Sequence, residues 1–419
     1  MQQHKRSTPG SAAVSEGKKI LITGGQLSNL GIRSLLFCTV DQLSRRFPDC
    51  RITLLSYRDH LRPEEEKQAF RFDIVPWDLE IKAWLLNKAA RAIRHLRGRR
   101  YDPVTLANLR SLLADASFII DISGFSLSSQ WPFRVSLHYL SNIMIARRFG
   151  IPFYIFPQSF GPFDFSRPQK ILIFPLMRRL LAYPEKIFAR EASSLEAVTR
   201  FTRDNVFPRP RIDMVLLNKG YDLKNIYTRI DSREPPLVGS PAVGIIPNLR
   251  AMERTDRNRM HCIYQDIIGV LLRHGKKVYI FSHTGEIDSP TAKEIYHQAG
   301  GKPGVYLIDK EFDVLDMEAL MKSFEFIVSS RYHAVVHAYK NGIPALVIGW
   351  ASKYPELLEK LNQSRYLTDV RDGLDKDRIL AQLDSLIVNC GRERKIIQTG
   401  IQALAGMDNS AVFSAIEAK

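Results

Sequence analysis

The sequence predicts an α/β protein made of two doubly wound domains, each with a parallel β-sheet. Short apolar runs rich in β-branched residues alternate with longer helical segments along most of the chain, a pattern typical of parallel sheets covered by helices. The chain has 419 residues, which is too long for one ordinary domain. Residues 227–241 are rich in Pro, Ser and charge and lack periodicity, so we interpret them as the linker between the domains.

This division defines the expected domain organisation. Residues 1–17 are polar, small and partly basic, without an apolar segment typical of a secretory signal, and we expect a disordered tail. Residues 18–226 form the N-terminal α/β domain and residues 242–373 the C-terminal one. From residue 374 to the end we expect helices that pack back across both domains.

Composition limits the class of function. The formal net charge of +16 suits nucleic acid, an anionic membrane surface or anionic small substrates. We rank nucleic acid lowest because spaced Cys/His pairs and RNP-like aromatic runs are absent and the basic residues are dispersed. The four cysteines show no Cys-x-x-Cys spacing, which indicates a reducing compartment. The sequence has no run of eighteen apolar residues, so we expect no membrane-spanning helix. We therefore expect a cytoplasmic protein.

Apolar runs predict ten strands. Five lie in the N-terminal half, at Lys19–Thr23, Arg51–Ser56, Ser117–Asp121, Pro152–Phe156 and Lys186–Ala189. Five lie in the C-terminal half, one beginning at Ala242 and the others at Lys277–Phe281, Val305–Ile308, Phe326–Val328 and Ala345–Ile348. Helices are expected from about Arg33 to Phe47, Asn258 to His274 and Arg331 to Lys340. Ser282–Ser289 is expected to be a polar loop.

The stretch from Phe326 to Ile348 predicts a strand–helix–strand unit with chemistry at its centre. Ser329 and Ser330 can cap a helix whose first turn contains Arg331, Tyr332 and His333. Free N–H groups and the dipole at that end favour an anion. Arg331 adds a charged fork suited to a carboxylate or phosphate, and His333 can move a proton near neutral pH.

Other polar residues follow predicted strands, where α/β sheets bind ligands. They are the Gly24–Gly31 turn containing Asn29, the segment Asp121–Gly124, the pair Gln158–Ser159, Arg190, and His283 with Asp288. Arg190 has a structural alternative, which is an ion pair with Glu191 or Asp213. Ser193 or Ser194 with Glu196 resembles a capping box that opens a helix.

Several of these residues together carry a family resemblance. The run Ser330-Arg331-Tyr332-His333, followed by Ala338, Gly342-Ile343-Pro344 and Lys353, resembles the signature of the polysaccharide pyruvyl transferases. The Gln158–Pro162 element and the Arg190-Glu191 pair are also similar to that family. The resemblance covers about Lys19 to Leu367, with Ile32 in place of an acidic residue and Phe125-Ser126 in place of a longer glycine run.

The resemblance implies a fold, a reaction and roles for residues. The fold is the GT-B architecture, with two Rossmann-like domains facing a cleft, the N-terminal domain on the acceptor side and the C-terminal domain on the donor side. The reaction is transfer of pyruvate from phosphoenolpyruvate to two hydroxyls of one sugar, which forms a cyclic ketal and releases phosphate. Donor-binding residues are then Arg331, Arg190, Tyr332, Ser330 and Lys353. Catalytic residues are His333, the first candidate for general acid, and His283, the second; acceptor-binding residues are Asn29, Gln158, Ser159 and Asp288.

This account needs neither a cofactor nor a metal, with phosphoenolpyruvate as co-substrate. The four-residue spacing of His333 and His337 suits zinc, but Ala334 stands where a metalloprotease carries Glu, and His337 is expected to face the core. Tyr332 has packing as its alternative role, and Lys353 has that of a solvated lysine.

Two further interpretations stay open. A glycosyltransferase of the same fold would use a nucleotide-sugar donor and a carboxylate on the ribose, for which Glu356 and Glu359 are candidates; a non-catalytic sugar-binding protein is the third class. Residues 80–100 form a basic amphipathic segment that suits either an anionic membrane or packing on the sheet, and packing is favoured. The membrane alternative, at the inner face of the cytoplasmic membrane, suits an acceptor linked to lipid.

Overall fold

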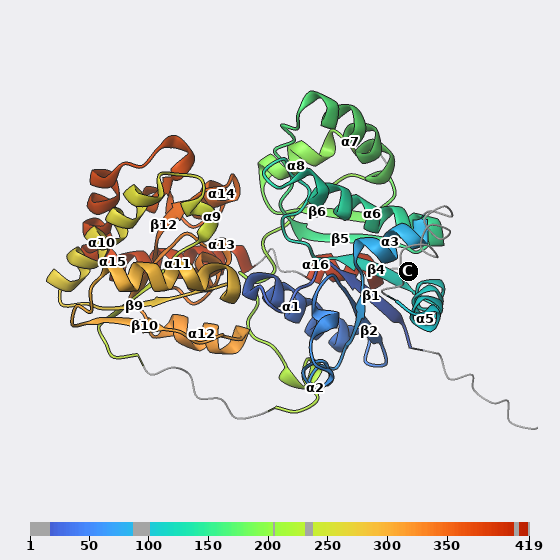
Figure 1. Cartoon of the computed structure of the whole chain (residues 1–419), viewed down its shortest axis with the longest axis horizontal. Helices are drawn as coiled ribbons and strands as arrows, with labels where there is room; N and C mark the ends of the chain where they lie inside the picture. Colours follow the sequence, from blue (N-terminus) through green and yellow to red (C-terminus); the bar gives the residue numbers. More distant parts are fainter. Residues whose placement is uncertain (1–16, 87–100, 204–205, 231–237, 406–409, 418–419) are drawn as a thin grey trace, which may run out of the picture.

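The computed structural model describes residues 17–86, 101–203, 206–230, 238–405 and 410–417. These residues form two α/β domains lying side by side, each built on one sheet with helices on both faces (Figure 1). The architecture confirms the predicted fold class of two doubly wound parallel-sheet domains. Residues 1–16 of the expected tail and parts of the expected linker and basic segment lie outside the described residues.

The N-terminal sheet has the order β3-β2-β1-β4-β5-β6-β7, and its paired strands are parallel. Its strands are β1 (Lys19–Thr23), β2 (Arg51–Ser56), β3 (Asp73–Pro76), β4 (Phe118–Asp121), β5 (Phe153–Gln158), β6 (Lys186–Ala189) and β7 (Arg209–Pro210). Ile20 in β1 pairs with Ile52 on one side and Phe118 on the other. The chain thus starts at the centre of the sheet and winds outward in both directions. The strand order reverses between β1 and β4, so the loops after these two strands lead to opposite sides and leave a crevice at their carboxyl ends.

The C-terminal sheet repeats this topology, with the order β10-β9-β8-β11-β12-β13. Its strands are β8 (Ala242–Ile246), β9 (Lys277–Phe281), β10 (Val305–Ile308), β11 (Phe326–Ser329), β12 (Ala345–Gly349) and β13 (Leu367–Asp369). Every residue of β8, β11 and β12 is buried, as expected for strands covered by helices on both faces. In this sheet the strand order reverses between β8 and β11, so the corresponding crevice lies at the carboxyl ends of these two strands.

Helices cover both sheets. The N-terminal domain contains α1 (Leu30–Arg46), α2 (Glu64–Gln68), α3 (Leu79–Leu86), α5 (Pro103–Ala114), α6 (Phe133–Phe149), α7 (Arg167–Leu180) and α8 (Ala192–Thr199). The C-terminal domain contains α9 (Leu249–Met252), α10 (Arg257–Arg273), α11 (Gly285–Gln298), α12 (Val314–Lys322), α13 (Tyr332–Lys340) and α14 (Lys353–Lys360). The last helices are α15 (Lys376–Leu404) and α16 (Ser410–Glu417). Within the described part of the chain, no helix has the length and apolar character needed to cross a membrane.

All ten predicted strands are present, and the prediction missed β3, β7 and β13. Each missed strand lies at an edge of its sheet and is only two to four residues long. The predicted loop over Ser282–Ser289 is wrong in its second half, because α11 begins at Gly285 and Asp288 lies in its first turn.

The basic segment that begins at residue 80 is described only as far as α3. Ile81 and Leu85 are buried in the core of the N-terminal domain, so the described part of the segment packs against the protein. Lys82, a basic residue of this segment, is buried, since only 1% of it is exposed. Its Nζ donates to Asn142 Oδ1 at 2.5 Å, and burial holds the pKa of this amine well below its ordinary value.

The C-terminal helices pack on both domains. α15 packs against α10 and α13 of the C-terminal domain, whereas α16 lies on the N-terminal one (Figure 1). In α16, Phe413 meets Phe156 of β5 edge-to-face with centroids 5.1 Å apart, and Arg46 of α1 lies 4.8 Å from the Phe413 ring. The chain therefore returns to the first domain after completing the second.

Candidate active site between the domains

A cavity of about 250 Å³ lies between the two domains, at the carboxyl ends of the central strands of both sheets. Loops after β1, β4 and β6 supply its N-terminal wall, and loops after β8, β9, β11 and β12 supply the other. Seven of the predicted site residues line this cavity, namely Asn29, Arg190, His283, Arg331, Tyr332, His333 and Lys353. The structure thus brings together groups that are up to 324 residues apart in the sequence.

The central strand–helix unit of the C-terminal domain differs from prediction in its cap. α13 begins at Tyr332, with Arg331 as the N-cap residue, and no side chain caps it. Ser329 Oγ instead accepts from the Arg331 N–H at 3.0 Å. Ser330 is fully buried, with its hydroxyl 2.7 Å from that of Tyr264, so it supports the loop and does not line the cavity.

Arg331 is fixed by a buried carboxylate. One terminal nitrogen of its guanidinium donates to Asp288 Oδ1 at 2.5 Å, and Asp288 is fully buried on α11. Asp288 Oδ1 also accepts from the Leu249 N–H at 3.2 Å. Arg331 Nε is buried without a hydrogen-bond partner. Asp288 therefore orients the guanidinium of Arg331, which lines the cavity.

Arg190 is the second guanidinium of the cavity, and it is also held by a carboxylate. It forms an ion pair with Asp213, and its other terminal nitrogen donates to Gly124 O at 2.5 Å and Ser159 Oγ at 3.1 Å. Its guanidinium carbon lies 5.4 Å from the centre of the Tyr332 ring. The structural alternative considered for Arg190, pairing with Asp213, is thus present.

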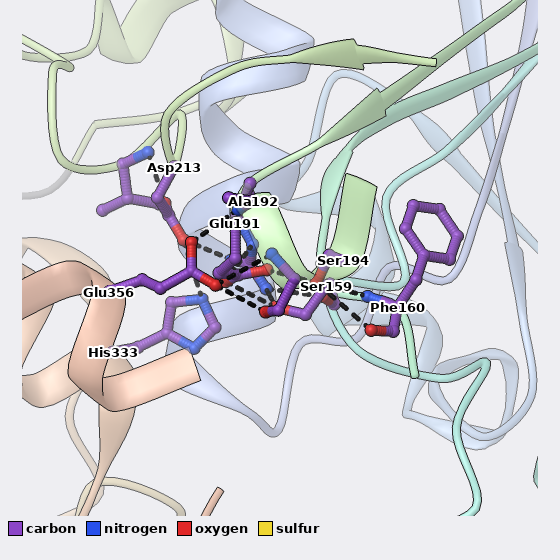
Figure 2. Close-up of polar contacts among 12 residues, drawn as sticks. Ser159, Phe160, Glu191, Ala192, Ser194, Asp213, His333 and Glu356 are labelled. Atoms are coloured by element: carbon purple, nitrogen blue, oxygen red, sulfur yellow. Dashed lines mark hydrogen bonds and ion pairs between the residues drawn. The ribbon is translucent and has the colours of Figure 1, made fainter. Parts of the chain in front are cut away.

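His333 shares the Asp213 carboxylate with Arg190. Figure 2 shows its ring beside Asp213, and its Nε2 lies 3.8 Å from Asp213 Oδ2. Nε2 of His333 and Nε2 of His283 are both buried without a hydrogen-bond partner. Burial lowers the pKa of both imidazoles well below the ordinary value, helped by Arg190 and Lys353 at His333 and by His337 and Arg331 at His283. Both rings are therefore neutral in the free protein at neutral pH.

Lys353 is not the solvated lysine considered as its alternative, since it is 8% exposed. Its Nζ lies 4.6 Å from the Tyr332 ring and 5.0 Å from the Phe125 ring. Burial, and then the charge of Arg190, lower the pKa of this amine to about 7. Lys353 consequently changes charge within the physiological pH range.

The glycine turn of the N-terminal domain contributes through close packing. Asn29 is the N-cap of α1, where its side chain accepts from the N–H of Gly31 at 3.1 Å and of Ile32 at 3.4 Å. A Cβ on Gly31 would lie 2.1 Å from His333 Nδ1. Gly31 is thus required for the approach of α1 to the other domain, and Ile32 lines the cavity.

Three predicted acceptor residues do not line the cavity. Gln158 is fully buried and donates to Tyr139 Oη at 3.0 Å and Asp121 Oδ1 at 3.3 Å. Ser159 donates to Glu191 Oε1 at 2.8 Å, and Asp288 holds Arg331 as described. Since these side chains bond inside the protein, the structure places them behind the cavity wall.

His337 faces the core, as expected. It is fully buried, its Nε2 lies 2.9 Å from Ser34 Oγ of α1, and burial lowers its pKa to about 3. Among the described residues, no group of three or more His, Cys, Asp or Glu side chains is arranged to hold a metal ion.

The predicted capping box at α8 is wrong. α8 begins at Ala192 with Glu191 as N-cap, and Ser194 Oγ donates to Glu191 Oε2 at 2.7 Å, whereas Glu196 pairs with Arg200. A carboxylate from the other domain occupies the helix end. Glu356 accepts from the Ala192 N–H at 2.5 Å, as Figure 2 shows. Sequence pattern gives no sign of this partner, because it lies 164 residues away.

Sequence reasoning also missed an aromatic part of the cavity wall. Trp131 meets Trp350 of the other domain edge-to-face at 5.8 Å and Phe125 at 5.9 Å, and all three line the cavity. Asn248 lines it as well and donates to Ser330 O at 2.9 Å. Asn248 could have been predicted as a site residue, because it lies just past the end of β8. Trp131 does not directly follow a predicted strand, so no such signal marks it.

Solved structures share the fold at low sequence identity. S. aureus MnaA, solved with UDP, superposes with a TM-score of 0.54 at 13% identity, covering 91% of this chain and 90% of that one. The trehalose-6-phosphate synthase OtsA gives 0.53 at 10%, covering 96% and 98%. A putative UDP-N-acetylglucosamine 2-epimerase from Listeria monocytogenes gives 0.53 at 11%, covering 91% of both chains. These likenesses establish a GT-B-like fold.

A search of curated proteins found no match to this sequence. The family model described as polysaccharide pyruvyl transferase, however, matches residues 29–352. The match includes Asn29 at the glycine turn, Arg190 and the Arg331–His333 segment, and it stops one residue before Lys353. By this match over most of its length, the chain belongs to the polysaccharide pyruvyl transferase family.

Proposed function

We propose that this protein transfers pyruvate from phosphoenolpyruvate to two hydroxyls of one sugar, forming a cyclic ketal and releasing phosphate. The observation that carries the proposal is the convergence of Arg190, Arg331 and Lys353 with two neutral histidines in one cavity between the domains. Phosphoenolpyruvate carries a carboxylate and a phosphate on adjoining atoms, so it suits a site with several fixed cationic donors.

In the proposed complex, Arg331 and Lys353 hold the donor directly. Arg331 lines the cavity, and Asp288 holds the plane of its guanidinium in place, so the guanidinium binds the donor's anionic group without reorganisation. Lys353 is charged in the complex and holds the phosphate as it leaves. Arg190 gives positive potential from behind Tyr332, because its terminal nitrogens are engaged by Asp213, Gly124 and Ser159.

The proposed chemistry needs two hydroxyl protons to move. One sugar oxygen bonds to the enol carbon that bears the phosphate, and the neighbouring methylene takes a proton to become a methyl group. The second sugar oxygen then displaces phosphate from the same carbon, and the second proton leaves with the phosphate. His333 is the first candidate to pass the proton and His283 the second, both being within the cavity lining.

The neutral state of His333 in the free protein bears on this role. A neutral imidazole accepts a hydroxyl proton, and the negative charge of bound donor raises its pKa by offsetting Arg190 and Lys353. On the acceptor side, Asn29 is the predicted residue that lines the cavity. Gln158 and Ser159 then act from behind the wall, Ser159 by its hydrogen bond to Arg190.

The alternative, a glycosyltransferase with a nucleotide-sugar donor, lacks a suitable ribose carboxylate among its candidates. Glu356 is engaged by the first turn of α8, and Glu359 is exposed. Calorimetry tests the two donors directly, with phosphoenolpyruvate and a panel of UDP-sugars titrated into wild type, Arg331→Ala and Arg257→Ala. Arg257 pairs with Glu294 at the surface of the same domain, and neither residue lines the cavity, so its variant controls for loss of charge.

We expect saturable binding of phosphoenolpyruvate to wild type and Arg257→Ala, and its loss in Arg331→Ala. A screen of saccharide acceptors for phosphate release then identifies the reaction. Binding of a UDP-sugar without binding of phosphoenolpyruvate would refute pyruvyl transfer and favour the glycosyltransferase.

A further inference from the structure

Helix α14 presents three polar residues to the N-terminal domain. Lys353, Glu356 and Lys360 are spaced at i, i+3 and i+7, which places them along one face of this eight-residue helix. Lys353 is in the cavity lining, while Glu356 and Lys360 contact the segment that begins at Arg190. The same helix face therefore carries a site cation and two contacts that cross between the domains.

The contacts of Glu356 are numerous and short. Its carboxylate accepts from the Ala192 N–H at 2.5 Å, from the Ser193 N–H at 3.0 Å and from Ser193 Oγ at 2.5 Å. Lys360 Nζ adds a hydrogen bond to Arg190 O at 2.8 Å. In Figure 2, Glu356 reaches across from its own ribbon to the start of α8.

Helix α8 needs this carboxylate. The first N–H groups of a helix have no partner within it, and a side chain at the N-cap usually supplies one. Here the N-cap residue is Glu191, but its carboxylate accepts from Ser159 Oγ and Ser194 Oγ and makes no cap hydrogen bond. Glu356 fills the place with a negative charge at the positive end of the helix dipole.

We propose that Glu356 is a positioning residue that holds the two domains together and thereby keeps Lys353 in the cavity. Lys353 and Glu356 lie one turn apart on one helix, so separation of Glu356 from α8 carries Lys353 with it. We call the contacts of Glu356 with Ala192 and Ser193 the clasp. With the clasp formed, Lys353 Nζ is 5.0 Å from the Phe125 ring of the N-terminal domain. The consequence for donor binding rests on the proposed function, whereas the clasp itself does not.

The test measures the accessibility of Lys353 and the affinity for donor separately. Wild type, Glu356→Ala and Glu356→Gln are acetylated briefly with acetic anhydride, and mass spectrometry follows the rate at Lys353 against exposed lysines. Glu196→Ala is the matched control, because it removes a carboxylate from the exposed side of α8, where Glu196 pairs with Arg200. Calorimetry with phosphoenolpyruvate and small-angle X-ray scattering use the same proteins.

We expect Lys353 of Glu356→Ala to acetylate about 2- to 30-fold faster than in wild type, the factor that corresponds to loss of a helix N-cap. Glu356→Gln keeps the shape of the side chain and one acceptor oxygen, so we expect Lys353 in this variant to acetylate at a rate between those of wild type and Glu356→Ala. The radius of gyration should rise in Glu356→Ala, and phosphoenolpyruvate should bind more weakly by a similar factor. Glu196→Ala should match wild type in each measurement.

An unchanged acetylation rate at Lys353 in both Glu356 variants, with unchanged scattering, would overturn the clasp. If Glu356→Ala fails to fold by circular dichroism, Glu356→Gln decides the matter by the same criteria. If wild type does not bind phosphoenolpyruvate, the proposed function fails, while acetylation and scattering still decide whether Glu356 holds the domains together.

Discussion

Donor binding should depend on pH through Lys353. The pKa of this amine is lowered to about 7 in the free protein by burial and by Arg190. An anion bound beside it favours the charged form, so the pKa in the complex returns upward. Above pH 7 a growing share of the free protein must therefore take up a proton before it binds, and the apparent affinity for phosphoenolpyruvate falls.

The size of the effect follows from the fraction of protein that carries the proton. With a pKa of about 7, that fraction is about one half at pH 7 and about 3% at pH 8.5. The apparent Kd should accordingly be about 16-fold weaker at pH 8.5 than at pH 7. Uptake of about 0.5 proton per donor bound should be found at pH 7 and nearly 1 at pH 8.5, since both histidines stay neutral in the free protein over this range.

Calorimetry in buffers of different ionisation enthalpy measures both quantities. Working at pH 7 and above keeps the donor phosphate mostly dianionic, because its second pKa is about 6. Lys353→Arg is the control, since guanidinium stays charged throughout and its variant should lose the dependence. A wild-type Kd that is constant from pH 7 to 8.5, or an equal slope in Lys353→Arg, would refute the reasoning.

Three further predictions concern stability, each measured by denaturant unfolding. Gly31→Ala should lose about 1–3 kcal/mol of unfolding free energy, since its Cβ would lie 2.1 Å from His333 Nδ1, and a loss below 0.5 kcal/mol would contradict this packing. Phe413→Ala should lose about 3–5 kcal/mol by emptying the contact of α16 with β5, and a surface-like loss would show that α16 is not docked. The pKa of His337 is about 3 in the folded protein, which is below its unfolded value. The free energy of unfolding is therefore unaffected by this group above about pH 6.5 and falls as the pH drops toward 3, because only the unfolded state binds the proton. Between pH 7.5 and 5, wild type should lose about 2 kcal/mol more than His337→Gln, and equal losses would refute this assignment.

The sequence predicted the central strands of both sheets well and the edge strands poorly. Apolar runs such as Ala345–Ile348 predict a buried strand, because helices cover both faces of the sheet and both sets of side chains are therefore apolar. β7 consists of Arg209 and Pro210, both exposed, so neither hydrophobic pattern nor propensity marks it. The burial of Lys82 could not be predicted from the sequence, because its partner Asn142 reaches it only after α3 and α6 have packed together.

The candidate site was predictable where chemistry follows a strand end in sequence. Arg331, His333 and Arg190 satisfy that rule, and the structure brings them to one cavity. Side chains such as Gln158 satisfy it too, yet point into the protein, since the rule locates a loop and does not give the direction of each side chain. The cap on α8 was beyond prediction, because a carboxylate from another domain has no local signature.

The return of the chain through α15 and α16 has a mechanical consequence. The polypeptide passes from the N-terminal domain to the C-terminal one before β8, and it passes back after α15, so two covalent connections join the same pair of bodies. A single connection limits the relative motion of the domains at one point, whereas two connections limit it at two points. A chain cut once between the domains then becomes two polypeptides that only non-covalent contacts hold together, among them the packing of α16 on β5.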